Sequence, residues 1–346
     1  MPLNKRIIDM VLIFCMLPAV LPACDVPVFR YALERWPPAT YTLTALLGGS
    51  HGTNEAAVIE SCGELYNGQD PTLNLRFETD SVASDGQNRL TLSYPLDRDR
   101  QRQIWDGPLT EANARLVAES PARKKIADEL LDGRLGVWVL LQCGDTNRDR
   151  AAEKLLNSEL KKLEKTLTLP EAVSTEAVSH LPELEISFST VTVSRDDPRE
   201  QVLVQMLSST EPDLVDYADQ PMAFPVFGRG RVLYALVGEG ISSVNIQEAS
   251  AFLAGPCACE IKDLTPGMDL LISADWQSVL EHSWVNAVDP LPLAGLGSMA
   301  ARDKQADSSQ QRSLSTPLLA MLGALAAVLI VVVLVSIRIV RSGRGK

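Results

Sequence analysis

Twenty consecutive residues without a charged side chain, from Leu318 to Ile337, constrain this chain more than any other feature. At a rise of about 1.5 Å per residue, a helix of this length spans about 30 Å, which is the thickness of the hydrocarbon core of a bilayer. Residues 328–335 are mostly β-branched, yet a helix is the form in which a single segment satisfies its own backbone in lipid. The sequence therefore predicts one C-terminal transmembrane helix over residues 314–337.

Basic residues follow the apolar run directly, because the tail of residues 338–346 contains Arg338, Arg341, Arg344 and Lys346. Cytoplasmic flanks of membrane helices carry an excess of Lys and Arg. We therefore expect the tail in the cytoplasm and the N-terminal body outside it. The predicted localisation is the cell membrane, with a single pass, and the lipid bilayer is the first expected partner.

The N-terminus has the three parts of a secretory signal peptide. Lys5 and Arg6 form a basic start, residues 11–21 form an apolar stretch, and Leu21-Pro22-Ala23 forms a cleavage site. The apolar stretch is too short to cross a bilayer comfortably. A signal peptide over residues 1–23 predicts the same topology as the C-terminal anchor, with the N-terminal body outside the cytoplasm.

The composition is that of a folded and acidic protein. Hydrophobic residues make up 46% and charged residues 22% of the chain, as in an ordinary globular domain. The formal net charge is −12, and no basic stripe is visible to bind a phosphate backbone. We therefore expect no nucleic-acid partner, and we interpret the acidity as an aid to solubility at a membrane surface.

Apolar periodicity predicts alternating strands and helices in the body. The continuous apolar run of residues 137–141 is typical of a strand buried on both faces. The charged segment of residues 150–167 carries leucines along one stripe, as a helix on a sheet would. We expect helices at residues 27–36, 54–66, 109–117, 120–131, 150–167, 198–207 and 241–253. We expect strands at residues 41–47, 73–77, 90–94, 137–141, 184–193, 224–237, 257–261 and 270–272.

The alternation makes α/β the expected fold class, with mixed sheets, flanking helices and one C-terminal transmembrane helix. Two prolines flank a polar stretch near residues 169–182, and the composition turns toward Gly, Pro and Ser near residue 287. The predicted organisation is a signal peptide at 1–23, α/β regions at 24–169 and 170–286, a polar linker at 287–313, the transmembrane helix at 314–337 and a basic cytoplasmic tail at 338–346.

The stretch of residues 224–231, with residues 233–237 and a helix ending at Leu253, resembles the end of a thioredoxin-like fold. That resemblance implies a strand opened by a proline, a glycine turn to the neighbouring strand, and a helix that closes the sheet. The Cys-x-x-Cys of that family is missing. Cys24 precedes a predicted helix, but Pro27 stands where the second cysteine would be, so no thioredoxin-type catalysis is carried over.

Residues 28–36, 137–141, 224–231 and 255–259 together resemble an uncharacterised family of membrane-anchored bacterial proteins of the planctomycete type. The likeness extends over most of the chain. It implies a location in the bacterial cell envelope and an envelope protein as an unidentified partner. It implies no activity.

Cys257 and Cys259 are the sharpest candidates for chemistry. Two thiols two residues apart can exchange disulfides or bind a soft metal. On a strand they would instead face one side together and serve as small core residues. A tetrahedral zinc site would need two more ligands, and the chain has three histidines. The core interpretation is favoured, and no cofactor or metal is predicted.

Cys24 follows Leu21-Pro22-Ala23, which resembles a bacterial lipobox in which the cysteine is acylated. Pro22 departs from the small or aliphatic residue usual there, and a lipid would duplicate the membrane helix. Ordinary cleavage before an unmodified Cys24, or a disulfide made by it, is favoured over lipidation.

Motifs of common enzymes are missing. The loop of residues 48–53 lacks the lysine and the glycine spacing of a phosphate loop, and no Gly-x-Ser-x-Gly or His-Glu-x-x-His motif occurs. We therefore predict a non-enzymatic binding, sensing or scaffold module of the cell envelope. The alternative is a thiol–disulfide oxidoreductase or redox-linked metal handler that uses Cys257 and Cys259.

Overall fold

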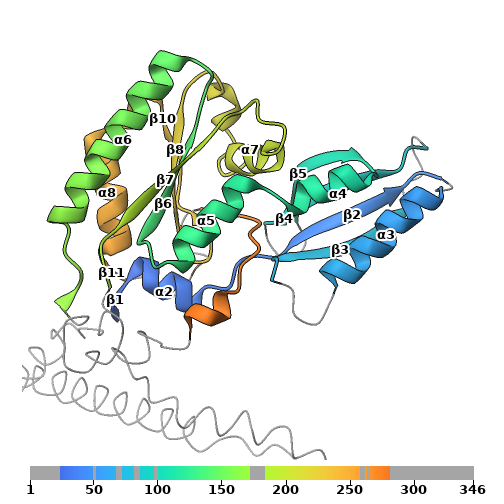
Figure 1. The fold of residues 1–346 in the computed structure, drawn as a ribbon, viewed down its shortest axis with the longest axis horizontal. Helices are drawn as coiled ribbons and strands as arrows, with labels where there is room; N and C mark the ends of the chain where they lie inside the picture. The colour runs from blue at the N-terminus through green and yellow to red at the C-terminus, as the bar shows by residue number, and fades with distance from the viewer. Residues whose placement is uncertain are drawn as a thin grey trace, which may run out of the picture. The chain divides into compact units, whose positions relative to one another are not determined.

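The computed structural model describes residues 24–49, 52–67, 72–81, 86–96, 100–171, 184–257, 262, 265 and 267–280. They form an α/β fold of mixed sheets with flanking helices, which confirms the expected fold class (Figure 1). The predicted signal peptide, linker, transmembrane helix and tail lie outside the described residues. Among the residues that are described, no helix combines the length and apolar character needed to cross a bilayer.

One sheet has four strands in the order β3-β2-β4-β5, and two helices pack on one of its faces. Its elements are β2 (Tyr41–Leu47), α3 (Thr53–Tyr66), β3 (Leu75–Ser81), β4 (Arg89–Pro95), β5 (Gln101–Pro108) and α4 (Glu111–Ala118). Strands β2 and β3 are parallel, and β4 is antiparallel to both β2 and β5. Alternate residues of β2, including Leu43 and Ala45, are buried against the helices, as period-two alternation predicts.

The outer edge of this sheet is closed by a side chain. The Asn67 amide donates to the Phe77 carbonyl at 3.0 Å, and the Phe77 N–H donates to the Asn67 side-chain oxygen at 3.0 Å. These two bonds replace the backbone partners that another strand would offer at this residue of β3. Capping an exposed edge in this way discourages pairing with a second chain.

The other main sheet has the order β12-β9-β8-β6-β7, with β10 paired to β8. Its strands are β6 (Gly136–Leu141), β7 (Phe188–Val193), β8 (Met222–Phe227), β9 (Arg231–Val232), β10 (Leu236–Val237) and β12 (Met268–Asp269). Strands β6 and β7 are parallel, and the remaining pairs are antiparallel. All six residues of β6 are buried, which confirms the prediction of a strand covered on both faces.

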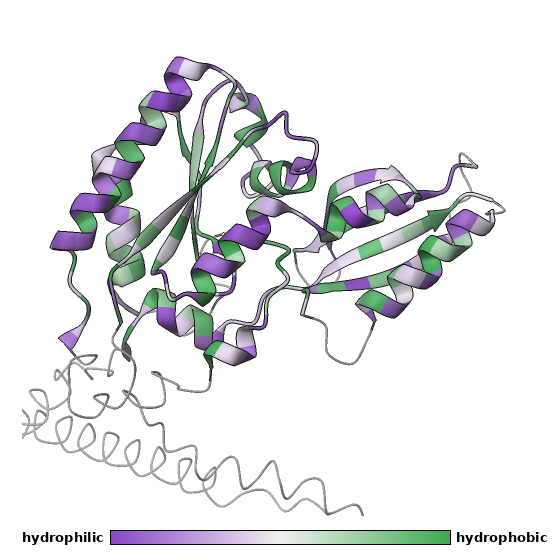
Figure 2. Cartoon of the chain, in the orientation of Figure 1, coloured by the Kyte–Doolittle hydropathy of each residue, from purple (hydrophilic) through white to green (hydrophobic). Residues whose placement is uncertain are grey.

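Helices cover both faces of this sheet (Figure 1). On one face lie α2 (Val28–Arg35), α6 (Thr146–Thr166) and α8 (Ser243–Ala254), and on the other lie α5 (Pro121–Leu131) and α7 (Gln201–Ser208). The predicted leucine stripe of α6 packs on the sheet through Leu156, Leu160 and Leu163. Polar and apolar bands alternate along this helix in Figure 2, as expected when one face is solvated.

Short elements complete the described chain. The 3-10 helices are Leu214–Tyr217, Gly238–Gly240 and Trp276–Val279, and a two-stranded ribbon pairs β1 (Cys24–Pro27) with β11 (Pro256–Cys257). Between β8 and β9, the glycines at 228 and 230 have φ values of 60° and 90°, which confirms the predicted tight turn. Strand β6 precedes the predicted boundary at residue 169 and pairs with β7 and β8 beyond it, so one sheet draws on both predicted regions.

Buried polar side chains join the two main sheets. The Arg123 guanidinium donates to the carbonyls of Val117 and Leu271 at 2.6 and 2.7 Å, and it is 3% exposed. The Tyr41 hydroxyl of β2 donates to the Asp269 carbonyl of β12 at 2.7 Å. The Asp269 carboxylate is in turn paired with Arg231 at 3.2 Å and with Lys262. Because buried charges must be paired or hydrogen-bonded, these contacts fix how the sheets meet.

Candidate functional site

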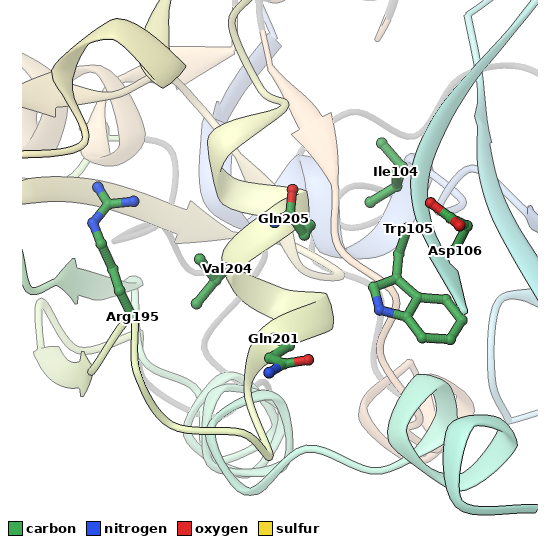
Figure 3. Close-up of a pocket in the computed structure, with 7 residues that line it drawn as sticks. All are labelled: Ile104, Trp105, Asp106, Arg195, Gln201, Val204 and Gln205. Atoms are coloured by element: carbon green, nitrogen blue, oxygen red, sulfur yellow. The ribbon is translucent and has the colours of Figure 1, made fainter. Parts of the chain in front are cut away.

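A crevice of about 470 Å³ lies between strand β5 of the four-stranded sheet and helix α7, which packs on the other main sheet. Its lining mixes one indole, two side-chain amides, one carboxylate and one guanidinium with two aliphatic side chains. These residues are Ile104, Trp105, Asp106, Arg195, Gln201, Val204 and Gln205 (Figure 3). Few apolar groups and several hydrogen-bonding groups in one hollow are suited to a small polar ligand.

A β-bulge directs the indole toward the crevice. The register between β4 and β5 shifts after Leu92, so that Leu92 lies opposite Trp105 and Ser93 lies opposite Gln103. Ile104 is the extra residue, and it is 5% exposed in the core, whereas Trp105 is only partly buried. Bulges redirect side chains in this way and are common beside functional sites.

Gly107 makes room for this indole. A Cβ atom at residue 107 would lie 2.7 Å from two ring carbons of Trp105 and 3.0 Å from the Asn113 side-chain nitrogen. Real Cβ atoms essentially never come within 3.0 Å of another heavy atom, so a side chain here would displace the ring. The absence of a side chain at residue 107 therefore sets the indole position.

Helix α7 presents its amides through simple helical spacing. Gln201 and Gln205 are four residues apart and exposed, while Val202, Leu203 and Met206 are buried in the core. The helix start is held in place because the buried Glu200 carboxylate accepts from the Ala122 N–H at 2.8 Å and from the Ser120 hydroxyl. The two amides thus extend from a fixed helix.

The two charged groups of the crevice are engaged differently. Asp106 forms an ion pair with Arg89 across the strands, and Gln103 donates to it at 3.3 Å. Arg195 contacts the Met222 sulfur at 3.4 Å, and its buried Nε has no hydrogen-bond partner among the residues that the structure describes. Figure 3 shows Arg195 on one side of α7 and Trp105 on the other. The indole and the two amides line this crevice together with the guanidinium.

A second hollow, of about 800 Å³, lies between α3 and α4. Leu65 on its wall is 67% exposed, and Cys62 and Tyr66 line it as well. Burial raises the pKa of Tyr66 to about 12, and it also raises the pKa of the Cys62 thiol. Both groups therefore keep their protons at neutral pH, and the charged side chains that line the groove are Glu111, Arg115 and Glu119.

Among the cysteines predicted as candidates, Cys257 is the one whose side chain the structure describes. Cys257 ends β11 and is 2% exposed, in the core cluster of α2 and α8, as the core interpretation expects. Cys259 lies outside the described residues. Cys24 begins β1, directly opposite Cys257 in the ribbon. The structure thus brings together Cys24 and Cys257, which the sequence analysis considered separately.

Cys143 is a further thiol that the sequence analysis did not single out. It lies between β6 and α6, at the carboxyl end of a parallel strand, where open α/β sheets often bind ligands. The Asp149 carboxylate accepts from the N–H groups of Cys143 and Gly144 at 2.9 and 3.1 Å. Burial raises the pKa of the Cys143 thiol, and Asp149 raises it further. Because the thiolate is the reactive form, this cysteine is poorly suited to redox catalysis.

Comparisons with known protein families and with curated proteins find no match to this chain. In the part of the chain that the structure describes, no group of three or more His, Cys, Asp or Glu side chains is placed to hold a metal ion. The function is therefore argued from the crevice, the cysteines and the sequence features alone.

Proposed function

We propose that this chain is a single-pass membrane protein of the cell envelope whose extracytoplasmic body is a non-enzymatic binding module. The observation that carries the binding role is the crevice, where Trp105 lies near the exposed amides of Gln201 and Gln205. The signal peptide, the uncharged run of residues 318–337 and the basic tail support the location. An envelope protein remains a proposed partner.

The chemistry of the crevice favours a neutral ligand rich in hydroxyl or acetamido groups, such as a saccharide of the envelope. An indole offers a flat apolar surface, and a glutamine amide both donates and accepts hydrogen bonds. Asp106 is already paired with Arg89, so it adds an acceptor but little net charge. A ligand with one apolar face and many hydroxyls uses all of these groups together.

The thioredoxin-like assignment is part of the same proposal. It is supported by the order of strands and α-helices from β6 to α8, which is strand, helix, strand, helix, three strands and helix. Strand β6 is parallel to its neighbour β7 and antiparallel to its other neighbour β8, and β9 is antiparallel to β8. Where that family has Cys-x-x-Cys, this chain has Cys143-Gly144-Asp145-Thr146, with one cysteine. Such a unit without a paired thiol suits binding better than disulfide exchange.

Binding is tested by titrating the full-length protein in detergent with soluble hexosamine oligosaccharides, using calorimetry. We expect Trp105→Ala to weaken binding by about tenfold or more, because stacking on the indole is lost. Tyr217→Ala removes an aromatic ring that is 42% exposed and does not line the crevice, so affinity should stay unchanged. Equal loss in both variants, or no binding at millimolar concentrations, would count against the crevice.

The alternative is a redox role for Cys257 and Cys259. Fast alkylation of both thiols in the native protein, with turnover of a model disulfide that is lost in the double alanine variant, would favour that role over binding. The 2% exposure of Cys257 supports slow alkylation instead.

A further inference from the structure

We infer that Cys24 and Cys257 form a disulfide that fastens the first described strand to the end of α8. This inference rests on the proposed extracytoplasmic location, since disulfides persist in oxidising compartments. It assigns Cys24 to a covalent link within the chain. It also excludes acylation of the same sulfur and pairing of Cys257 with Cys259.

The strand register carries the inference. Cys24 and Cys257 are Cα partners in the antiparallel ribbon of β1 and β11, whose register shifts between Cys24 and Pro27. Paired residues of antiparallel strands have Cα atoms about 4.5 to 5.5 Å apart. A disulfide requires Cα atoms about 4.4 to 6.8 Å apart. The Cα spacing expected of a paired Cys24 and Cys257 therefore falls within the range that a disulfide requires.

The ribbon is also weak without a covalent link. The only other pair in its register is Pro27 with Pro256, and a proline nitrogen has no hydrogen to donate. Strand β11 has two residues, and an isolated two-stranded ribbon is marginally stable in water. Beyond the ribbon, the Val28 N–H donates to the Gly255 carbonyl at 3.0 Å. Few backbone hydrogen bonds hold the register of β1 and β11, and a disulfide would fix it.

The surroundings of Cys257 suit a bond that persists. Cys257 packs in the core cluster with Phe29, Trp36 and Leu253, at 2% exposure. A reductant would reach a bond here only after the ribbon opens. Cys62 and Cys143, the other cysteines with described side chains, lie in α3 and after β6. Neither belongs to an element paired with β1 or β11, so they do not compete for this partner.

The reaction balances with a disulfide-containing oxidant of the envelope as co-reactant. A thiolate of one cysteine attacks the oxidant's disulfide, and a mixed disulfide forms as one oxidant thiol leaves. The second cysteine then attacks this mixed disulfide and releases the other oxidant thiol. The two protein thiols lose two electrons and two protons, and the oxidant becomes a dithiol.

The experiment maps disulfides by mass spectrometry in the purified full-length protein, after equilibration with oxidised and reduced glutathione. We expect one linked peptide pair containing Cys24 and Cys257, which Cys24→Ser abolishes and the control Cys143→Ser keeps. Oxidation should raise the melting temperature of the wild type by about 5–15 °C, and of the Cys24→Ser variant not at all. A Cys257–Cys259 link, a lipid mass on Cys24, or no link under oxidising conditions would overturn the inference.

A second sample separates this inference from the proposed location. Cells are quenched with acid and alkylated at once, so that the linkage present in the cell is preserved. Detection of the Cys24–Cys257 disulfide in both samples would support both the disulfide and the extracytoplasmic location. If the link forms in the purified protein but is absent from cells, the geometry is upheld and the extracytoplasmic location is overturned.

Discussion

At the scale of single residues, the surroundings of the thiols of Cys62 and Cys143 support the proposed binding role more than a redox role. The thiols of Cys62 and Cys143 have pKa values raised by burial. Trp105, in contrast, is held partly exposed by a bulge and by the missing side chain at Gly107. The residues most accessible to a ligand are therefore those that recognise by shape and hydrogen bonds.

The Cys143 environment predicts a pH dependence. Because its thiol pKa is raised, the thiolate fraction at pH 7 falls below that of an ordinary cysteine, and it grows only as the pH rises through the raised value. Alkylation of Cys143 by iodoacetamide should be slower than alkylation of free cysteine at pH 7. Removing the acidic neighbour with Asp149→Asn should speed it. Rapid alkylation of the wild type at pH 7 would show an activated thiol.

At the scale of elements, helices and strands with strong local sequence patterns could be predicted, whereas those that depend on tertiary contacts could not. The apolar run of β6 and the Ser-Pro start of α5 predicted elements that the structure confirms. Strand β5 escaped prediction, because it begins with the polar residues 101–103 and its bulge breaks the period-two alternation. Such a strand forms because it pairs with a neighbouring strand, here β4.

The last strand was predicted at residues 270–272 but lies at Met268–Asp269. Residues 270–272 are buried as expected, yet their backbone bonds go elsewhere. The Leu270 N–H donates to the Gly230 carbonyl at 2.9 Å, and the Ile272 N–H donates to the Asn74 side-chain oxygen at 2.9 Å. An apolar run shows burial, but it does not show which groups satisfy its backbone.

The candidate crevice could not be predicted from the sequence either, because it too depends on contacts between distant elements. Trp105 and Gln201 belong to elements that are far apart in the chain, and no spacing or motif links them. Sequence reasoning favoured the cysteines because two close thiols form a local pattern. It predicted the core role of Cys257, but it had no means of placing Cys24 opposite Cys257.

A substitution in β5 tests how this element shapes the crevice. Gly107→Ala should destabilise the protein by about 1–3 kcal/mol, because the new methyl group overlaps the Trp105 ring. It should also weaken oligosaccharide binding as the indole shifts. Gly240→Ala is the matched control, since a Cβ there meets no atom within 4 Å, and it should change stability by less than about 0.5 kcal/mol. Chemical denaturation and calorimetry measure both effects, and unchanged binding by Gly107→Ala would contradict the role of β5.

At the scale of the whole molecule, the proposal joins a described body to ends that only the sequence describes. In the body, Arg123, Tyr41 and Asp269 tie two sheets together around one candidate crevice. The predicted signal peptide, the apolar run and the basic tail support the proposal that this body lies outside the cytoplasm. The envelope ligand and the disulfide both depend on that assignment.

Membrane topology is therefore the central claim, and a reporter that is active only in the cytoplasm tests it directly. Fused after Lys346, the reporter should be active, because the four basic residues of the tail hold it inside. Inserted at Gly295, in the predicted linker, it should be inactive. Activity at Gly295 with none at Lys346 would reverse the orientation, and activity at both would show that the run of residues 318–337 does not cross the membrane.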